Sequence, residues 1–145
     1  MRKSLKVLLT VLPFIYMGAI WYMSSQPDDL ILDLPSSSVD HFIKEALHLV
    51  EFAILYMLFA AALAAHGKLT STWSILAAIL ASLYGICDEI HQSFIPARSA
   101  SLIDVIKDVI GVLAAYFHVR YHYFKHHRGF LTIIENMTRK AVSSR

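Results

Sequence analysis

Apolar residues along the chain gather in four blocks, separated by short stretches of charged and small polar residues. The blocks cover residues 7–23, 49–65, 69–90 and 102–119. Each approaches the ~20 residues that an α-helix needs to cross a hydrocarbon core ~30 Å thick. The pattern predicts an all-α fold, a polytopic membrane bundle of four transmembrane helices, with a short amphipathic segment over residues 130–137 after it.

The fourth block is the least apolar, because Asp104, Lys107 and Asp108 lie in its first two turns. Ionisable residues in a membrane helix face protein or water rather than lipid. We therefore expect the polar end of this helix to pack inside the bundle. Ser101, just before the block, is expected to cap it.

Composition agrees with a lipid environment, since 57% of the residues are hydrophobic. The net charge of +2 is small and the basic residues form no stripe interleaved with aromatics, which argues against a nucleic-acid partner. The lone Cys87 excludes an intramolecular disulfide and a CxxC motif. The first block ends in Trp21, Tyr22 and Met23, which offer no small-residue cleavage site, so we expect an uncleaved helix rather than a signal peptide.

Lysine and arginine residues gather at one set of helix ends, which the positive-inside rule assigns to the cytoplasm. These residues are Arg2, Lys3, Lys6, Lys68, Arg120, Lys125 and Arg128. The opposite side carries every acidic residue except Glu135. Both termini are therefore expected in the cytoplasm. We divide the chain into a transmembrane domain, residues 1–124, and a basic, amphipathic cytoplasmic tail, residues 125–145.

Polar residues recur at helical spacing near the outward ends of the second, third and fourth helices. The three sets are Lys44, His48 and Glu51; Asp88, His91 and Gln92; and Asp104, Asp108 and Gly111. Spacings of three and four residues place the members of each set on one helix face. Because a charge at membrane depth costs roughly 2.5 to 3.5 kcal/mol on insertion scales, we expect the three faces to converge on one outward-facing polar pocket.

Three interpretations of this cluster stay open. In the first, His48 or His91 exchanges a proton with a substrate, as general acid–base catalysis requires. A carboxylate, Asp88 or Glu51, then fixes the histidine tautomer. In the second, the same four residues supply nitrogen and oxygen ligands from facing helices to a divalent metal. In the third, the cluster forms hydrogen bonds and salt bridges that only hold the bundle together.

Arg98 follows Pro96 in the loop before the last helix. Its guanidinium has the fork geometry that binds a carboxylate or a phosphate. It could hold an anionic headgroup, or it could pair with Glu89 or Asp104.

The polar residues resemble the signature of the VanZ-like membrane proteins. The matching residues are Asp88-Glu89-Ile90-His91-Gln92, Pro96-x-Arg98-Ser99-x-Ser101, Asp104, Asp108 and Gly111, with two upstream landmarks, Ser24-Ser25-Gln26-Pro27 and His48-x-x-Glu51. The resemblance covers about residues 20–115. Three positions depart from the family pattern: Phe52 replaces a usual tyrosine, Ala97 a usual glycine, and Glu45 a usual lysine. A mechanism that needs the tyrosine hydroxyl would lack it here.

The resemblance implies a bacterial cytoplasmic-membrane protein, from a family whose namesake is linked to resistance to the lipoglycopeptide teicoplanin. We expect the pocket to bind or modify a lipid-linked or cell-wall intermediate of the cell envelope. The alternative is a non-catalytic membrane binding or assembly protein in which the polar cluster is structural. A transporter fits less well, because four helices leave little room for alternating access. Whether the protein is an enzyme stays open.

The expected partners are membrane lipids and either a lipid-linked cell-wall precursor or a lipoglycopeptide, with no nucleic acid. No cofactor is assigned, and a divalent metal is one of the open alternatives. The candidate catalytic residues are His48, Glu51, Asp88 and His91. The candidate substrate-binding residues are Glu89, Gln92, Arg98, Asp104 and Asp108.

Overall fold

The computed structural model describes residues 2–26, 37–96 and 101–139, and within these ranges it leaves out the side chains of residues 2, 37–45 and 48. The elements in chain order are α1 (Arg2–Ser24), α2 (Ser37–Ala65), α3 (Ser71–Gln92), α4 (Leu102–Val119), the π-helical turn η2 (Arg120–Lys125) and α5 (Phe130–Arg139). The protein is 86% helical, and the ranges just given contain no β-strand. The all-α prediction is therefore confirmed.

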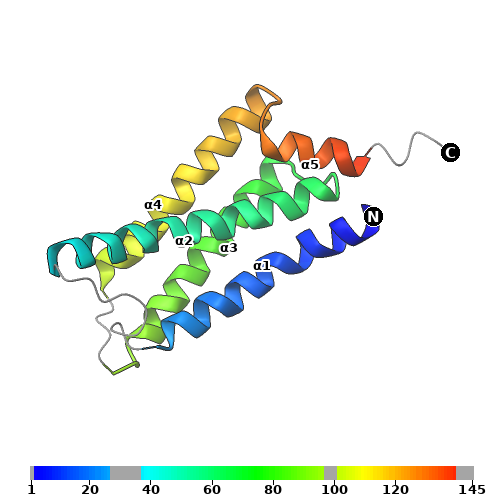
Figure 1. The fold of residues 1–145 in the computed structure, drawn as a ribbon. Coiled ribbons are helices and arrows are strands. Elements are labelled where there is room, and N and C mark those ends of the chain that lie inside the picture. The colour runs from blue at the N-terminus through cyan, green and yellow to red at the C-terminus, as the bar shows by residue number, and fades with distance from the viewer. Residues whose placement is uncertain (1, 27–36, 97–100, 140–145) are drawn as a thin grey trace.

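The long helix α2 lies at the centre of the bundle, where it packs against α1, α3, α4 and α5. Figure 1 shows the start of α1 and the end of α5 at one end of the molecule. The ends of α1 and α3 meet at the other end (Figure 1).

The predicted blocks agree with the helices, with one large difference. α4 begins and ends as predicted, and Ser101 caps it, because its Oγ accepts a hydrogen bond from the Asp104 backbone N–H over 3.2 Å. α2 begins at Ser37, well before the apolar block that starts at residue 49. Its first turns are too polar to belong to the apolar block, but the helical spacing of Lys44, His48 and Glu51 already placed them on this helix.

The helices approach closely where glycines stand. A Cβ added to Gly111 in α4 would fall on the backbone carbonyl of Leu49 in α2. A Cβ at Gly85 in α3 would lie 3.2 Å from the Cβ of Asp108. Small residues of this kind let membrane helices pack backbone to backbone. The α2–α4 crossing therefore depends on Gly111 having no side chain.

α3 buries small and polar residues and exposes large apolar ones, the reverse of a helix in a water-soluble protein. Its buried residues are small or polar: Ser74, Ala77, Ala78, Ala81, Gly85, Asp88, Glu89 and Gln92. Its exposed residues are large and apolar, and they include Ile75, Leu76, Ile79, Leu80 and Leu83. A helix in water buries its apolar face, so this arrangement indicates that lipid surrounds the bundle.

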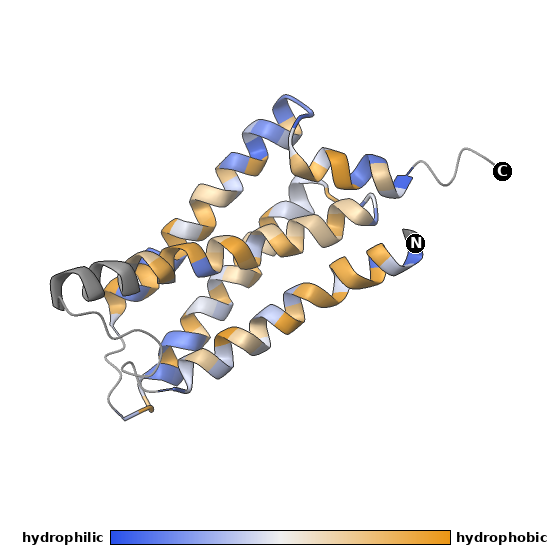
Figure 2. Cartoon of the chain, viewed as in Figure 1, coloured by the Kyte–Doolittle hydropathy of each residue, from blue (hydrophilic) through white to orange (hydrophobic). Residues whose placement is uncertain are grey.

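Length and hydropathy identify two of the described helices as able to span a membrane, Lys3–Ser24 in α1 and Ser71–Gln92 in α3. The apolar part of α2, Leu49–Ala65, is shorter. Figure 2 shows hydrophobic residues along the middle of α1 and hydrophilic residues gathered at the helix ends. A membrane bundle is therefore supported, while spans through α2 and α4 are part of the proposal below.

The segment expected to be a cytoplasmic tail includes a helix that packs on the bundle. Leu131 and Ile134 of α5 are buried, and α5 contacts α2. The hydroxyl of Tyr123 in η2 donates a hydrogen bond to Glu135 Oε2 over 2.6 Å. α5 is thus held by both an apolar face and a polar contact.

Candidate functional site

A buried hydrogen-bond group joins the end of α1 to the end of α3. Asp88 in α3 is 0% exposed, and its Oδ2 accepts a hydrogen bond from Ser24 Oγ over 2.8 Å. Gln92, one turn later, donates from Nε2 to the same oxygen over 2.7 Å and to Ser24 Oγ over 3.3 Å. Two donors on one oxygen stabilise a buried carboxylate, which without partners would be costly. We call Ser24, Ser25, Asp88, His91 and Gln92 the α1–α3 polar centre.

His91 lies at the partly exposed edge of this centre. Its ring stacks on Trp21 of α1, with the ring centroids 3.9 Å apart and the planes 19° from parallel. Its Nε2 lies 3.0 Å from Ser25 Oγ. The hydroxyl hydrogen of Ser25 is already donated to the Trp21 carbonyl over 2.7 Å. A hydroxyl has only one hydrogen to donate, so in this arrangement Ser25 Oγ accepts a hydrogen bond from His91 Nε2, and Nδ1 is the ring nitrogen that does not contact Ser25.

The sequence predicted that Asp88 or Glu51 would orient a histidine. In the structure Ser25 contacts His91 Nε2 while Asp88 Oδ2 is bonded to Ser24 and Gln92, so the orienting role of a carboxylate stays a prediction. The serine contacts arise because α1 packs against the polar face of α3 and supplies hydroxyls there. The side chains of His48 and of Arg98 lie outside the described residues, so their predicted roles stay predictions.

The remaining carboxylates gather where α2, α3 and α4 meet. Glu89 is 4% exposed and Asp108 is 1% exposed. Asp108 packs beside Gly85 and lies within electrostatic range of Glu51, Asp88, Glu89 and Asp104. Asp104 also forms a 3.0 Å ion pair with Lys107. The predicted faces of these three helices therefore do converge, although their roles in binding or catalysis stay predictions.

The VanZ/LLP1 family model matches residues 3–124. The chain belongs to the VanZ/LLP1 family. Comparisons with curated proteins and with solved structures give no match. Membership confirms the resemblance inferred from the sequence, and it associates the chain with membrane proteins linked to glycopeptide resistance.

The VanZ/LLP1 match spans α1 to α4, so it contains the whole polar centre. Within the described part of the chain, no three histidine, cysteine, aspartate or glutamate side chains come together in a way that could hold a metal ion. The metal interpretation depended on His48, whose side chain is outside that part. A metal in this VanZ/LLP1 protein therefore stays a prediction.

Two residues of α1, Trp21 and Ser24, and Ser25 directly after it were missed as site residues. The two serines stand in the sequence as a family landmark after the first apolar block, which could have signalled their role. Trp21 gave no such signal, because a tryptophan at the end of a membrane helix is also typical of an interfacial anchor. Its stacking on His91 becomes evident only once α1 and α3 are placed together.

Proposed function

We propose that this VanZ/LLP1 protein crosses the bacterial cytoplasmic membrane four times, with both termini in the cytoplasm and the α1–α3 polar centre facing outward. The distribution of lysine and arginine supports this orientation. Figure 1 shows the start of α1 and the end of α4 at one end of the bundle and the end of α3, the helix that carries Asp88 near its last turn, at the other. In this arrangement α2 and α4 also span the membrane, with α2 at the centre of the bundle and α4 facing lipid along Ile106, Ile110 and Leu113.

In this orientation the polar centre binds the headgroup of a lipid-linked or cell-wall intermediate of the cell envelope. The observation that carries the proposal is the pair of acceptors left at the end of the bundle. Asp88 Oδ1 is buried with no hydrogen-bond partner among the described residues, and His91 Nδ1 is not the nitrogen that contacts Ser25. His91 Nδ1, on a partly exposed ring, can accept from a hydroxyl or amine donor of a sugar or peptide headgroup, whereas Asp88 Oδ1 is reached only if that headgroup enters the buried centre. Arg98 would hold its phosphate or carboxylate.

Two versions of this function differ in whether a bond is broken. In the catalytic version, His91 Nδ1 takes a proton from a substrate hydroxyl as a general base. Ser25, through its contact with Nε2, is then a positioning residue. In the non-catalytic version, the centre fastens α1 to α3 and recognises a lipoglycopeptide or an assembly partner. The bonds of Asp88 to Ser24 and Gln92 within the chain favour this second version.

The experiment that separates the versions compares His91→Asn with Asp88→Ala in a teicoplanin-susceptible bacterial host. Teicoplanin susceptibility, membrane abundance and thermal stability in detergent are measured for each variant. In the catalytic version His91→Asn removes protection while abundance and stability stay unchanged. In the non-catalytic version stability and protection fall together for Asp88→Ala, and His91→Asn keeps its protection.

A matched control is His126→Asn, which changes an exposed histidine after α4. It should leave every readout at the wild-type value. If the wild-type protein itself leaves susceptibility unchanged, the proposed link to glycopeptide resistance is wrong for this member.

A further inference from the structure

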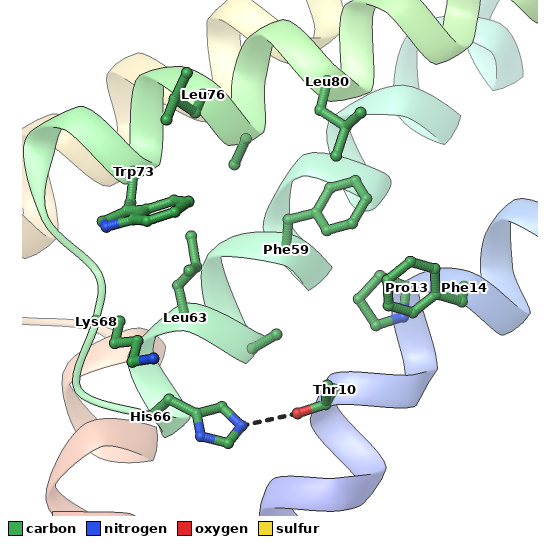
Figure 3. A pocket seen from close by; sticks show the side chains of 12 residues that line it. Thr10, Pro13, Phe14, Phe59, Leu63, His66, Lys68, Trp73, Leu76 and Leu80 are labelled. Atoms are coloured by element: carbon green, nitrogen blue, oxygen red, sulfur yellow. Dashed lines mark hydrogen bonds between the residues drawn. The ribbon is translucent and has the colours of Figure 1, made fainter.

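A second candidate site lies at the end of the bundle opposite to the polar centre. A cavity of about 400 Å³ opens between α1, α2 and α3. This volume falls in the range of roughly 300–1,000 Å³ that small-molecule sites occupy. Figure 3 shows its walls, which include Pro13, Phe14, Phe59, Leu63, Leu76 and Leu80. None of these residues belongs to the polar centre, so the site is separate from it, and only the leaflet assigned below rests on the orientation proposed above.

Polar side chains stand at only one end of this cavity. His66 and Lys68, from the turn between α2 and α3, lie there with Thr10 of α1, while Phe59 and Leu80 lie farther along (Figure 3). Thr10 Oγ1 donates to the Lys6 carbonyl over 2.7 Å and lies 2.9 Å from His66 Nε2. The one hydroxyl hydrogen is used on the carbonyl, so His66 donates to Thr10. The cavity is thus polar at its mouth and apolar along its length.

That polarity matches a lipid molecule better than water or a polar metabolite. Polar groups that could hold water are confined to the mouth, and cavities lined by apolar side chains stay dry. Around the cavity, Phe14, Leu76 and Leu80 are exposed, so its sides are continuous with the lipid-facing surface. An acyl chain can enter from the bilayer without crossing a polar barrier.

Positive charge at the mouth of the cavity favours a lipid with an anionic headgroup. Lys68 is exposed and lines the mouth of the cavity, whereas Lys3 and Lys6, on the first turns of α1 at the same end of the molecule, do not line it. Lysines near the cytoplasmic leaflet attract anionic lipids. The phosphate of such a lipid would lie at the depth of Lys68 while its chain runs along Phe59.

We propose that this cavity binds an anionic glycerophospholipid of the cytoplasmic leaflet, with one acyl chain between Phe59 and Leu80 and the headgroup phosphate beside Lys68. Trp73, which also lines the cavity, makes the proposal measurable. The chain has two tryptophans, so the Trp21→Phe variant leaves Trp73 as the only indole. Bromine atoms on an acyl chain quench an indole that they touch.

The full-length Trp21→Phe protein is placed in phosphatidylcholine vesicles that contain a minor fraction of phosphatidylglycerol. The acyl chains of one lipid or the other are brominated, at equal mole fraction. We expect brominated phosphatidylglycerol to quench Trp73 at lower mole fraction than brominated phosphatidylcholine, by about five-fold, as one lysine near an anionic lipid contributes. Lys68→Gln should abolish this preference.

Lys125→Gln is the matched control, because Lys125 belongs to η2 and does not line the cavity. This variant should keep the preference. Equal quenching by the two lipids, or a preference that survives Lys68→Gln, overturns the proposal. A third outcome would also overturn the proposal. If either lipid quenches Trp73 only after residues 140–145 are removed, the end of the chain, and not a lipid, occupies the cavity.

Discussion

Ser24 of α1 and Asp88 of α3, which are 64 residues apart in the sequence, are joined by a buried hydrogen bond of 2.8 Å. It connects the first helix to the family's most recognisable segment. Both partners are buried: Ser24 is 4% exposed and Asp88 is 0% exposed. A wholly buried carboxylate needs donors, and α1 supplies one of the two that it has.

Replacing Ser24 by alanine should therefore destabilise the protein by about 1–3 kcal/mol, the cost of leaving a buried acceptor short of a donor. Thermal unfolding in detergent measures this loss. The control is Ser93→Ala, since Ser93 is exposed and its hydroxyl donates to the Ile90 carbonyl of the adjoining α3 rather than across two helices. Its effect should stay within about 0.5 kcal/mol. Equal melting temperatures for the two variants would mean that the Ser24–Asp88 bond contributes nothing.

Gly111 should tolerate no side chain. Its substitution by alanine would push a methyl group into the Leu49 carbonyl, and backbone atoms cannot rotate away as a side chain can. We expect a loss of about 3 kcal/mol or more, at the upper end of the range for overpacking. The yield of folded protein on size-exclusion chromatography, together with its melting temperature, reports this.

Gly18 provides the comparison for Gly111. It lies inside α1 with nothing within 4 Å of an added Cβ. Alanine there should be neutral or stabilising by about 0.5–1 kcal/mol, because it restricts the unfolded chain and favours the helix. A Gly111→Ala variant as stable as Gly18→Ala would show that α2 and α4 are farther apart than the structure has them.

Much of the helix pattern and of the polar cluster could be predicted from the sequence, because both depend on local pattern. Ser101 caps α4 and the helix begins at Leu102, as expected for a capping residue that precedes an apolar block. The shared faces of Asp88 and His91, or of Asp104 and Asp108, follow from helical spacing. Convergence of these faces was predicted from the cost of charge in lipid, and the structure places the carboxylates near each other.

What could not be predicted depends on how helices pack. No spacing rule relates Ser25 to His91, because their contact exists only when α1 lies against α3. Likewise the apolar face of α5 could have faced lipid, and only the bundle shows that Leu131 and Ile134 are buried against protein. The charged first turns of α4 were correctly assigned to its helix from the sequence. The apolar block of α2 did not show where that helix begins, because its first turns are polar.

The stacking of Trp21 on His91 gives an optical test of the polar centre. In a Trp73→Phe background Trp21 is the only indole, and the imidazole lies 3.9 Å from it. A stacked imidazole quenches indole emission, so His91→Gln should raise the emission of Trp21. His66→Gln is the control, because His66 contacts Thr10 at the other end of the bundle and should change nothing. Unchanged emission in His91→Gln would mean that the two rings are not stacked in solution.

The docking of α5 should weaken at alkaline pH. Burial, and then the hydrogen bond that Tyr123 donates to Glu135, raise the pKa of the Tyr123 phenol above its ordinary value. Tyr123 lies in η2, beyond the proposed fourth span. A raised pKa means that docking favours the neutral phenol. Its contribution is complete below a pH of about 10, the ordinary value for tyrosine, and is lost as pH rises through the raised value.

A nitroxide label reports this undocking. In a Cys87→Ser background the label is attached to Asn136→Cys, at an exposed position of α5. Its mobility should increase as pH rises above about 10, where tyrosine ordinarily ionises. In Tyr123→Phe that increase should disappear, because no phenol is left to ionise. Deprotonation of the nearby Lys125 would act equally in both proteins, so the same rise in Tyr123→Phe would assign the effect to lysine and contradict the role given to Tyr123.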